Sequence, residues 1–165
     1  MKFKNISGFD FVKVSEAYLS DTALKATFNG KPLDDWKLKL KLVVNESILD
    51  AEQSAYLVFK NDDILYVGYF SNSFKKRWWK KKGYFWHGDI LDNKVNELVK
   101  SGHDVSVWIS VNPYFEQFNI SKIIEDSIIM KYADKGIINT VGKSLKKDKI
   151  NTYPVREILE IDCAE

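Results

Sequence analysis

The chain has 165 residues, 45% of them hydrophobic, which is enough apolar material for one domain with a sizeable core. Its 25 Lys and Arg against 23 Asp and Glu give a net charge of +2, which excludes a uniformly basic coat. The single cysteine, Cys163, excludes an internal disulfide, and no apolar run reaches the roughly 18 residues that span a bilayer. The N-terminus has no secretory pattern, so we expect a soluble cytoplasmic protein without a membrane partner.

The first third of the chain, residues 1–50, carries the weakest structural signals. Lys and Leu alternate over residues 37–42, which indicates a half-buried strand. A helical stripe is an equally good interpretation, because Trp36, Leu40 and the two valines at 43–44 follow a candidate aspartate cap. Both interpretations stay open, and we treat residues 1–50 as an N-terminal extension.

From Ser54 onward the pattern is clearer and predicts β-β-α-α-β-α. Two apolar, aromatic runs at 55–59 and 64–69 are joined by a polar linker, which is typical of a hairpin. Helices are predicted over residues 73–82, 90–99 and 121–133, and alternating valines and isoleucine predict a strand over 105–111. This order favours an α+β fold with a small three-stranded antiparallel sheet flanked by helices.

A basic aromatic segment lies between Ser71 and Gly88. It contains six cationic residues and no acidic ones, interleaved with aromatic rings: Lys75, Lys76, Arg77, Lys80, Lys81, Lys82, Phe74, Trp78, Trp79, Tyr84, Phe85 and Trp86. Cations neutralise phosphates and flat rings can stack on bases, so the segment favours nucleic acid. The competing interpretation is a solvated basic helix whose aromatic rings belong to the core. Adjacent tryptophans on a helix cannot both face one core, so at least one is expected at a surface.

Four residues could supply phosphate chemistry if the fold brings them together. Tyr56 and Tyr66 lie on the paired strands, and phenols can donate, accept or relay a proton. Arg77 offers a fork of donors to phosphate oxygens. Glu125 lies on the last predicted helix, and a lone carboxylate can hold a largely hydrated Mg²⁺. Each residue taken alone also fits an ordinary packing or surface role.

The order of these residues resembles the GIY-YIG nuclease family. Residues 54–56 (Ser-Ala-Tyr) and 66–68 (Tyr-Val-Gly) match its two signatures, with the tyrosines ten residues apart. Residues 74–78 are similar to the helix that carries the family's arginine, and residues 123–131 to the helix that carries its glutamate. Ile138-Asn139 is similar to the asparagine that follows. The resemblance covers residues 54–143, and it departs where Ser54 replaces the first signature's glycine.

This resemblance implies a DNA endonuclease that hydrolyses phosphodiester bonds with one Mg²⁺ or Mn²⁺ ion. Glu125 would hold the metal, and Tyr56 or Tyr66 would help to activate the attacking water. Arg77 would stabilise the phosphate. The auxiliary residue would be Lys81, one helical turn after the arginine, with His87 as the alternative. The further residues expected to contact DNA are Lys75, Lys76, Trp78, Trp79, Lys80, Lys82 and Asn139.

We therefore expect a site-specific endonuclease of restriction or phage type that acts on double-stranded DNA, as a monomer or a homodimer. Residues 1–50 would add DNA contacts or an oligomer interface, 51–143 would form the nuclease core, and 144–165 a basic then acidic tail. The first alternative is a non-catalytic nucleic-acid-binding module on the same scaffold. The second is a protein-interaction domain that uses exposed tryptophans.

Overall fold

The protein is described by a computed structural model that covers residues 1–24, 27–28, 31–32, 36–79, 83–85 and 89–139. The strands are β1 (Phe3–Ile6), β2 (Phe9–Leu24), β3 (Thr27–Phe28), β4 (Lys31–Pro32), β5 (Trp36–Leu42), β6 (Glu52–Lys60), β7 (Asp63–Ser73), β8 (Val105–Ser110), β9 (Tyr114–Phe115) and β10 (Phe118–Asn119). The helices are α1 (Phe74–Trp78), α2 (Asp89–Lys100) and α3 (Ser121–Tyr132), with short 3-10 turns at Glu46–Asp50 and Ala133–Lys135.

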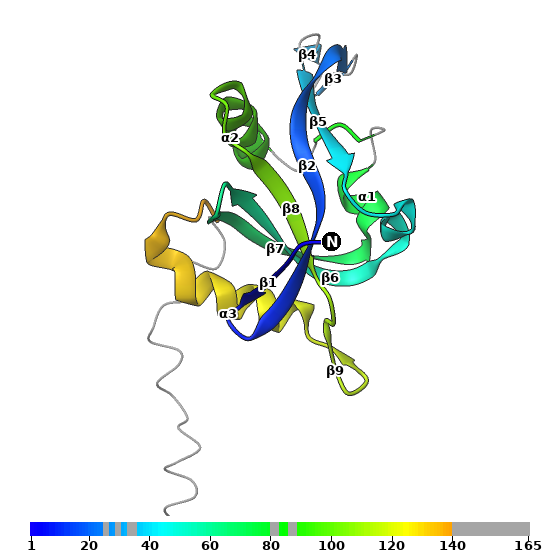
Figure 1. The fold of residues 1–165 in the computed structure, drawn as a ribbon, viewed down its shortest axis with the longest axis vertical. Coiled ribbons are helices and arrows are strands. Elements are labelled where there is room, and N and C mark those ends of the chain that lie inside the picture. The colour runs from blue at the N-terminus through cyan, green and yellow to red at the C-terminus, as the bar shows by residue number, and fades with distance from the viewer. Residues whose placement is uncertain (25–26, 29–30, 33–35, 80–82, 86–88, 140–165) are drawn as a thin grey trace, which may run out of the picture.

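The main sheet is antiparallel and has six strands, so the prediction of a small three-stranded sheet is wrong. Its order is β1-β2-β8-β6-β7, and β5 also pairs with β2. The three expected strands, β6, β7 and β8, are present as neighbours, but residues 1–50 extend the sheet beyond β8. Figure 1 shows β2 and β8 side by side through the centre of the molecule.

The reason for this larger sheet is visible in β8. All six of its residues are buried, so it behaves as a central strand whose two backbone edges both need partners. β6 pairs with one edge and the long strand β2 with the other, in a register that sets Phe11 opposite Ser110. The other edge of β2 holds β1 near its start and β5 near its end.

The ambiguous segment 37–42 belongs to a strand, β5. Leu38 and Leu40 are buried while Lys37 and Lys41 are exposed, as the two-residue period predicts. The strand conformation prevails because β2 offers an unpaired edge, which a helix could not satisfy. The candidate caps Asp34 and Asp35 lie outside the described residues.

The hairpin, the second and third helices and the strand over 105–111 are confirmed with small changes at their ends. β6 and β7 form the expected hairpin, with Asn61 in the left-handed region at φ 51°. α3 stops shortly before Gly136, whose φ of 83° a residue with a side chain rarely adopts. The arginine-bearing helix α1 is shorter than predicted, because it ends at Trp78.

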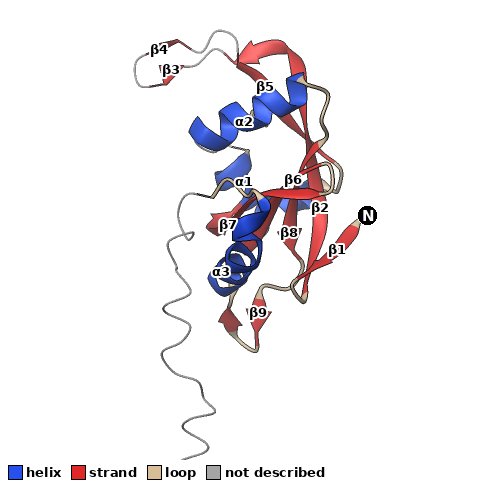
Figure 2. Ribbon diagram, turned by 90° about the vertical axis from the view of Figure 1, so that its left-hand side faces the viewer, coloured by secondary structure: helices blue, strands red, loops and turns tan. Residues whose placement is uncertain are grey.

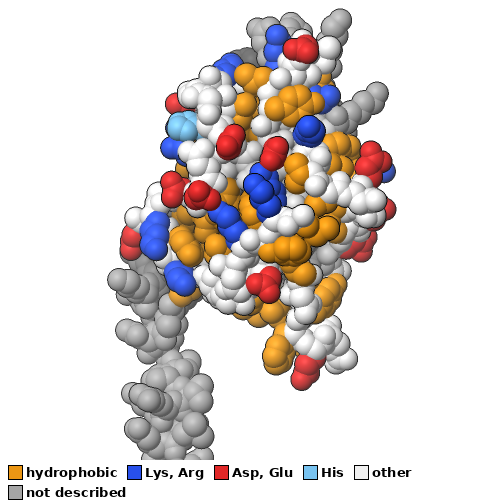
Figure 3. Space-filling view, in the orientation of Figure 1, with side chains coloured by type: hydrophobic (Ala, Val, Ile, Leu, Met, Phe, Trp, Pro, Cys, Tyr) orange, Lys and Arg blue, Asp and Glu red, His pale blue; other side chains and the backbone are white. Residues whose placement is uncertain are grey.

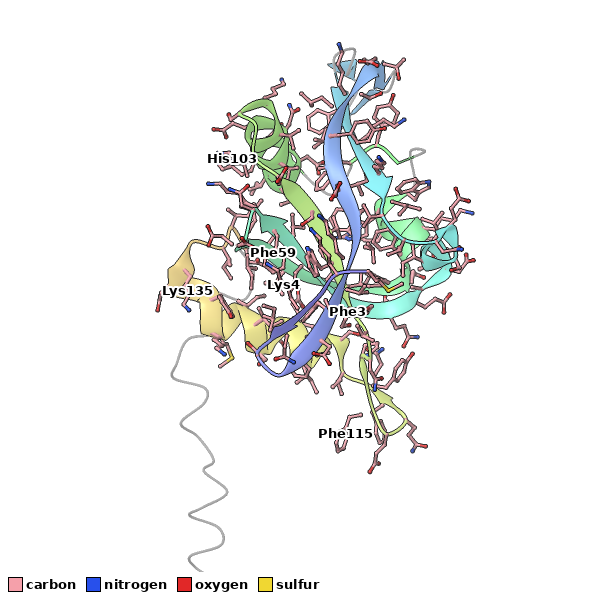
Figure 4. All side chains as sticks on the ribbon, in the orientation of Figure 1. Phe3, Lys4, Phe59, His103, Phe115 and Lys135 are labelled. Atoms are coloured by element: carbon pink, nitrogen blue, oxygen red, sulfur yellow. The ribbon has the colours of Figure 1, made fainter. Side chains whose placement is uncertain are left out.

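Two hydrophobic clusters stabilise the sheet, and side chains alternate between them along β6. Tyr56 and Val58 join the cluster that packs under α1 and α2, whereas Leu57 and Phe59 join the one under α3. In Figure 2 the three helices follow one another along one side of the view, with β1 and β2 on the other. The β9–β10 hairpin projects beyond this body, with Phe115 exposed near its tip (Figures 1 and 4).

No helix in the described ranges is both long enough and apolar enough to cross a bilayer. On the face shown in Figure 3, acidic and basic side chains are interspersed among apolar ones. This mixing agrees with the small net charge of the chain.

Candidate functional site

The two signature tyrosines lie side by side on neighbouring strands. Tyr56 on β6 and Tyr66 on β7 have ring centroids 6.1 Å apart and nearly parallel planes, and their hydroxyls are hydrogen-bonded. Tyr56 is almost completely buried, whereas Tyr66 retains some exposure. Because both belong to a tight antiparallel hairpin, their relative position is set by the strand register rather than by a flexible loop.

Gly68 is needed for the position of the Tyr56 ring. It is the register partner of Tyr56 across the hairpin, and the ring lies directly over its Cα. A Cβ at position 68 would lie 2.8 Å from Tyr56 Cε1 and would overlap Cζ and Oη. The Tyr-Val-Gly signature therefore has a steric explanation here, since only glycine leaves room for this phenol.

Arg77 joins this pair from α1. Its Nη2 donates a hydrogen bond of 3.1 Å to Tyr56 Oη, and its guanidinium carbon lies 5.8 Å from the centre of that ring. The helix is fixed by the buried rings of Phe74 and Trp78 and by Ser73, whose hydroxyl caps its first turn. In the sequence Arg77 lies between Phe74 and Trp78, and unlike these two residues it is half exposed.

Glu125 joins these residues from α3, the helix that packs on the second hydrophobic cluster. It lies on α3, its side chain is only 13% exposed, and Lys122 Nζ lies 2.7 Å from its Oε2. Burial raises the pKa of Glu125, while Lys122 and, more weakly, Arg77 act to lower it. The Glu125 charge in turn raises the pKa of both tyrosines. Residues from four elements that are up to 69 positions apart in sequence thus share one electrostatic environment.

The two phenols differ in how readily they lose a proton. Burial raises the pKa of Tyr56 far above its usual range, against the opposing effect of Arg77. Burial also raises the pKa of Tyr66, but Arg77 and the hydrogen bond from Tyr56 both lower it. The pKa of Tyr66 nevertheless stays above its usual value, so both phenols act here as hydrogen-bonding groups rather than as bases. Tyr56 accepts the hydrogen bond from Arg77 and holds the Tyr66 ring beside it.

A hollow of about 400 Å³ lies between the end of β7 and α1, and Arg77 is the member of the cluster that lines it. Its lining combines hydroxyl, amide and cationic side chains with aromatic rings: Tyr69, Phe70, Ser71, Asn72, Lys76 and Arg77. Lys75 and Lys76 are exposed on the same helix. The hollow can admit a polar, anionic group to within reach of the guanidinium.

Two of the residues predicted to contact DNA lie in the interior instead. Trp78 is 1% exposed and packs edge-on against Tyr56, with centroids 5.0 Å apart. Asn139 is buried, and its amide accepts from Val67 N at 2.9 Å and donates to Val67 O at 2.6 Å. Both therefore support the hairpin from within rather than face solvent. Trp79 is partly buried.

Several other predicted residues lie outside the described residues. They are Lys80, Lys81, Lys82 and His87, together with the tail from residue 140. The auxiliary position that the resemblance assigns to Lys81 or His87 thus has no structural description.

Sequence reasoning missed Lys122 and two polar residues that line the hollow, Ser71 and Asn72. Lys122 contacts both Glu125 and Asp126, which are three and four positions along the same helix. This spacing is the signal that could have identified it, because such residues are neighbours on a helical face. The hollow-lining residues Ser71 and Asn72 carry no comparable local pattern.

The donor set around Glu125 fits a hydrated divalent cation. Among the described residues, no three His, Cys, Asp or Glu side chains gather into a metal-binding group. Mg²⁺ retains most of its waters and is commonly held by one or two carboxylates plus substrate phosphates, so such a group is not required. The Glu125 carboxylate is partly accessible, and the charge of Arg77 acts on its pKa. It can therefore serve as the single carboxylate ligand that such an ion needs.

Comparisons with known proteins supply no independent identification. No protein-family model matches the sequence. No curated protein and no solved structure matches the chain significantly. The functional argument therefore rests on the chemistry and geometry of the residues themselves.

Proposed function

We propose that this protein is a metal-dependent endonuclease of the GIY-YIG type that hydrolyses phosphodiester bonds in duplex DNA. The observation that carries the proposal is the convergence of Tyr56, Tyr66, Arg77 and Glu125 in one cluster, of which Arg77 lines the hollow. If these four residues had only ordinary packing or surface roles, we would not expect the fold to place them together. The sequence resemblance assigns catalytic roles to the same four residues.

In this mechanism Arg77 binds a non-bridging oxygen of the scissile phosphate and offsets the charge that builds up during attack. Its hydrogen bond to Tyr56 Oη keeps the guanidinium aimed at the hollow. Tyr66, the more accessible phenol, hydrogen-bonds to the attacking water and orients it, and the proton of the water passes to bulk solvent.

Glu125 would hold the divalent ion, which supplies Lewis-acid stabilisation of the phosphate. Its position on α3, within electrostatic reach of the tyrosine pair, supports this role. The exposed lysines 75 and 76 would bind flanking phosphates, a contribution that weakens as salt rises. Hydrolysis adds water to phosphorus as one P–O ester bond breaks, so no co-reactant beyond water is needed.

The test is cleavage of supercoiled plasmid and of a mixed DNA library in Mg²⁺, in Mn²⁺ and in EDTA. We expect metal-dependent cutting by the wild type and a loss of at least about 10³-fold in Glu125→Gln, equivalent to about 4 kcal/mol of transition-state stabilisation. The matched control is Glu97→Gln, because Glu97 on α2 makes the same kind of ion pair with Lys94 and lies outside the cluster. Sequencing the cut ends would identify the recognition site.

Two outcomes would refute the proposal in different ways. Equal cutting by Glu125→Gln and the wild type would exclude Glu125 as the metal ligand. Intact DNA under all metal conditions, with salt-dependent binding retained, would instead support a non-catalytic nucleic-acid-binding module.

A further inference from the structure

Lys122 places its ammonium group directly on the proposed metal ligand. Its Nζ lies 2.7 Å from Glu125 Oε2 and 2.6 Å from Asp126 Oδ1. The same Nζ lies 5.7 Å from the centre of the Tyr69 ring, which lines the hollow together with Arg77. One cation therefore bridges two carboxylates and lies near a ring that also lines the hollow.

The position of this lysine is unfavourable for the helix itself. Lys122 is the second residue of α3, and the positive end of the helix dipole disfavours a cation there. The first turn has no acidic residue, and Ile120 supplies no side-chain cap that would offset this. The carboxylates of the second turn offset this unfavourable position, because they pair with the ammonium at i,i+3 and i,i+4.

The two partners differ in how freely they can move. The Glu125 side chain is 13% exposed and packed, whereas the Lys122 side chain is 54% exposed. The carboxylate is thus the fixed member of the pair, and the lysine can swing into solvent or toward a bound anion. Because the ammonium is the exposed member of the pair, moving it to another anion at the surface takes no charge into the interior.

A divalent ion on Glu125 would lie close to this ammonium. Like charges about 4 Å apart repel strongly even at the dielectric constant of a protein surface. The metal must therefore displace Lys122 or bind more weakly because of it. A phosphate in the hollow changes this competition, since it offers the ammonium another anionic partner.

We propose that Lys122 occupies the cation position at Glu125 in the free protein and moves to a DNA phosphate when substrate binds, which releases the carboxylate for the metal ion. This inference rests on the proposed function. It makes DNA and metal binding cooperative, and by linkage each ligand raises the affinity for the other by the same factor. The free protein then holds little metal, and the site assembles only on substrate.

The experiment measures Mn²⁺ affinity by electron paramagnetic resonance of free Mn²⁺ at pH 8. Each titration is run with and without a 30-base-pair duplex, and a gel confirms afterwards that the duplex is intact. The variants are Lys122→Met, Lys122→Arg and Glu125→Gln. Lys94→Met is the matched control, because Lys94 forms an i,i+3 pair with Glu97 on α2 at 3.1 Å. Circular dichroism checks that every variant is folded.

We expect the free Lys122→Met protein to bind Mn²⁺ about tenfold more tightly than the wild type. The duplex should raise the Mn²⁺ affinity of both proteins, because phosphate oxygens help to hold the metal, but by about tenfold more in the wild type than in Lys122→Met. Lys122→Arg and Lys94→Met should behave like the wild type, because the first retains the cation and the second leaves it untouched.

Equal Mn²⁺ affinity in the free wild type and free Lys122→Met would overturn the inference while leaving the proposed nuclease intact. An equal DNA effect on both proteins would do the same. Mn²⁺ binding that survives in Glu125→Gln, or no Mn²⁺ binding by any protein, would overturn the metal site itself and the inference with it.

Discussion

Replacing Gly68 with alanine tests the close approach of the Tyr56 ring, on which the geometry of the candidate site depends. The new Cβ would lie 2.8 Å from Tyr56 Cε1 and would overlap Cζ and Oη, which real Cβ atoms essentially never do. The ring cannot retreat, because it is 1% exposed and lies between the rings of Trp78, Phe70 and Tyr66, with centroids 5.0, 6.2 and 6.1 Å away. Either the hairpin or α1 must move.

Overpacking of this kind costs about 1–3 kcal/mol of unfolding free energy. For a chain of this size that corresponds to a fall of about 2–12 °C in Tm. The displaced phenol would also lose the 3.1 Å hydrogen bond from Arg77. Without the clash, alanine should instead stabilise a strand by about 0.5–1 kcal/mol relative to glycine. The sign of the change in unfolding free energy therefore shows whether the clash exists.

The assay is denaturant unfolding of the wild type, Gly68→Ala, Tyr56→Leu and the double variant. In the Tyr56→Leu background the ring is absent, so Gly68→Ala should become neutral or stabilising. The two changes should therefore be strongly non-additive, as expected for residues in contact. A neutral Gly68→Ala in the wild type, or an equal cost in both backgrounds, would refute the reasoning.

Three further predictions concern separate parts of the molecule. Lys4→Met should lower the unfolding free energy by about 1 kcal/mol, because Lys4 Nζ lies 4.5 Å above the Phe59 ring (Figure 4). A loss of stability that disappears in 1 M salt would instead indicate the exposed ion pair of Lys4 with Asp62. Asn139→Ala should cost about 1–3 kcal/mol and accelerate hydrogen exchange of the Val67 amide, because both backbone groups of Val67 lose their side-chain partner; unchanged exchange at that amide would contradict it. Burial raises the pKa of Glu125 above its ordinary 4.5, so at subsaturating metal the kcat/KM for cleavage should fall as pH drops through a midpoint above 4.5, where the metal-free carboxyl takes up a proton; a midpoint at or below 4.5 would contradict it.

Much of the local structure could be predicted because it depends on short-range interactions. The β6–β7 hairpin follows from two apolar runs around a polar turn, and α3 ends where Gly136 allows a left-handed conformation. The alternation of Lys and Leu in β5 is equally clear in the sequence, but only the free edge of β2 distinguishes a strand there from a helical stripe.

The candidate site was predictable in its members but not in their orientation. Tyr56, Tyr66, Arg77 and Glu125 are identified by residue type and order. Sequence could not show that Trp78 faces the core and Asn139 the backbone of Val67, because both depend on packing between distant elements. The basic aromatic segment is thus divided by the fold, with its lysines at 75 and 76 exposed and Trp78 buried.

The sequence by itself determined the hairpin, the helices and the chemical groups available for phosphate chemistry, since each depends on residues within a few positions of one another. Only the tertiary structure decided the size of the sheet, because the partner of β8 is a strand about a hundred residues earlier, with Phe11 opposite Ser110. It also decided the relation of Lys122 to the hollow, since the ring beneath its ammonium, Tyr69, belongs to β7 whereas Lys122 belongs to α3. Long-range pairing and side-chain burial are properties of the whole chain, and no local pattern encodes them.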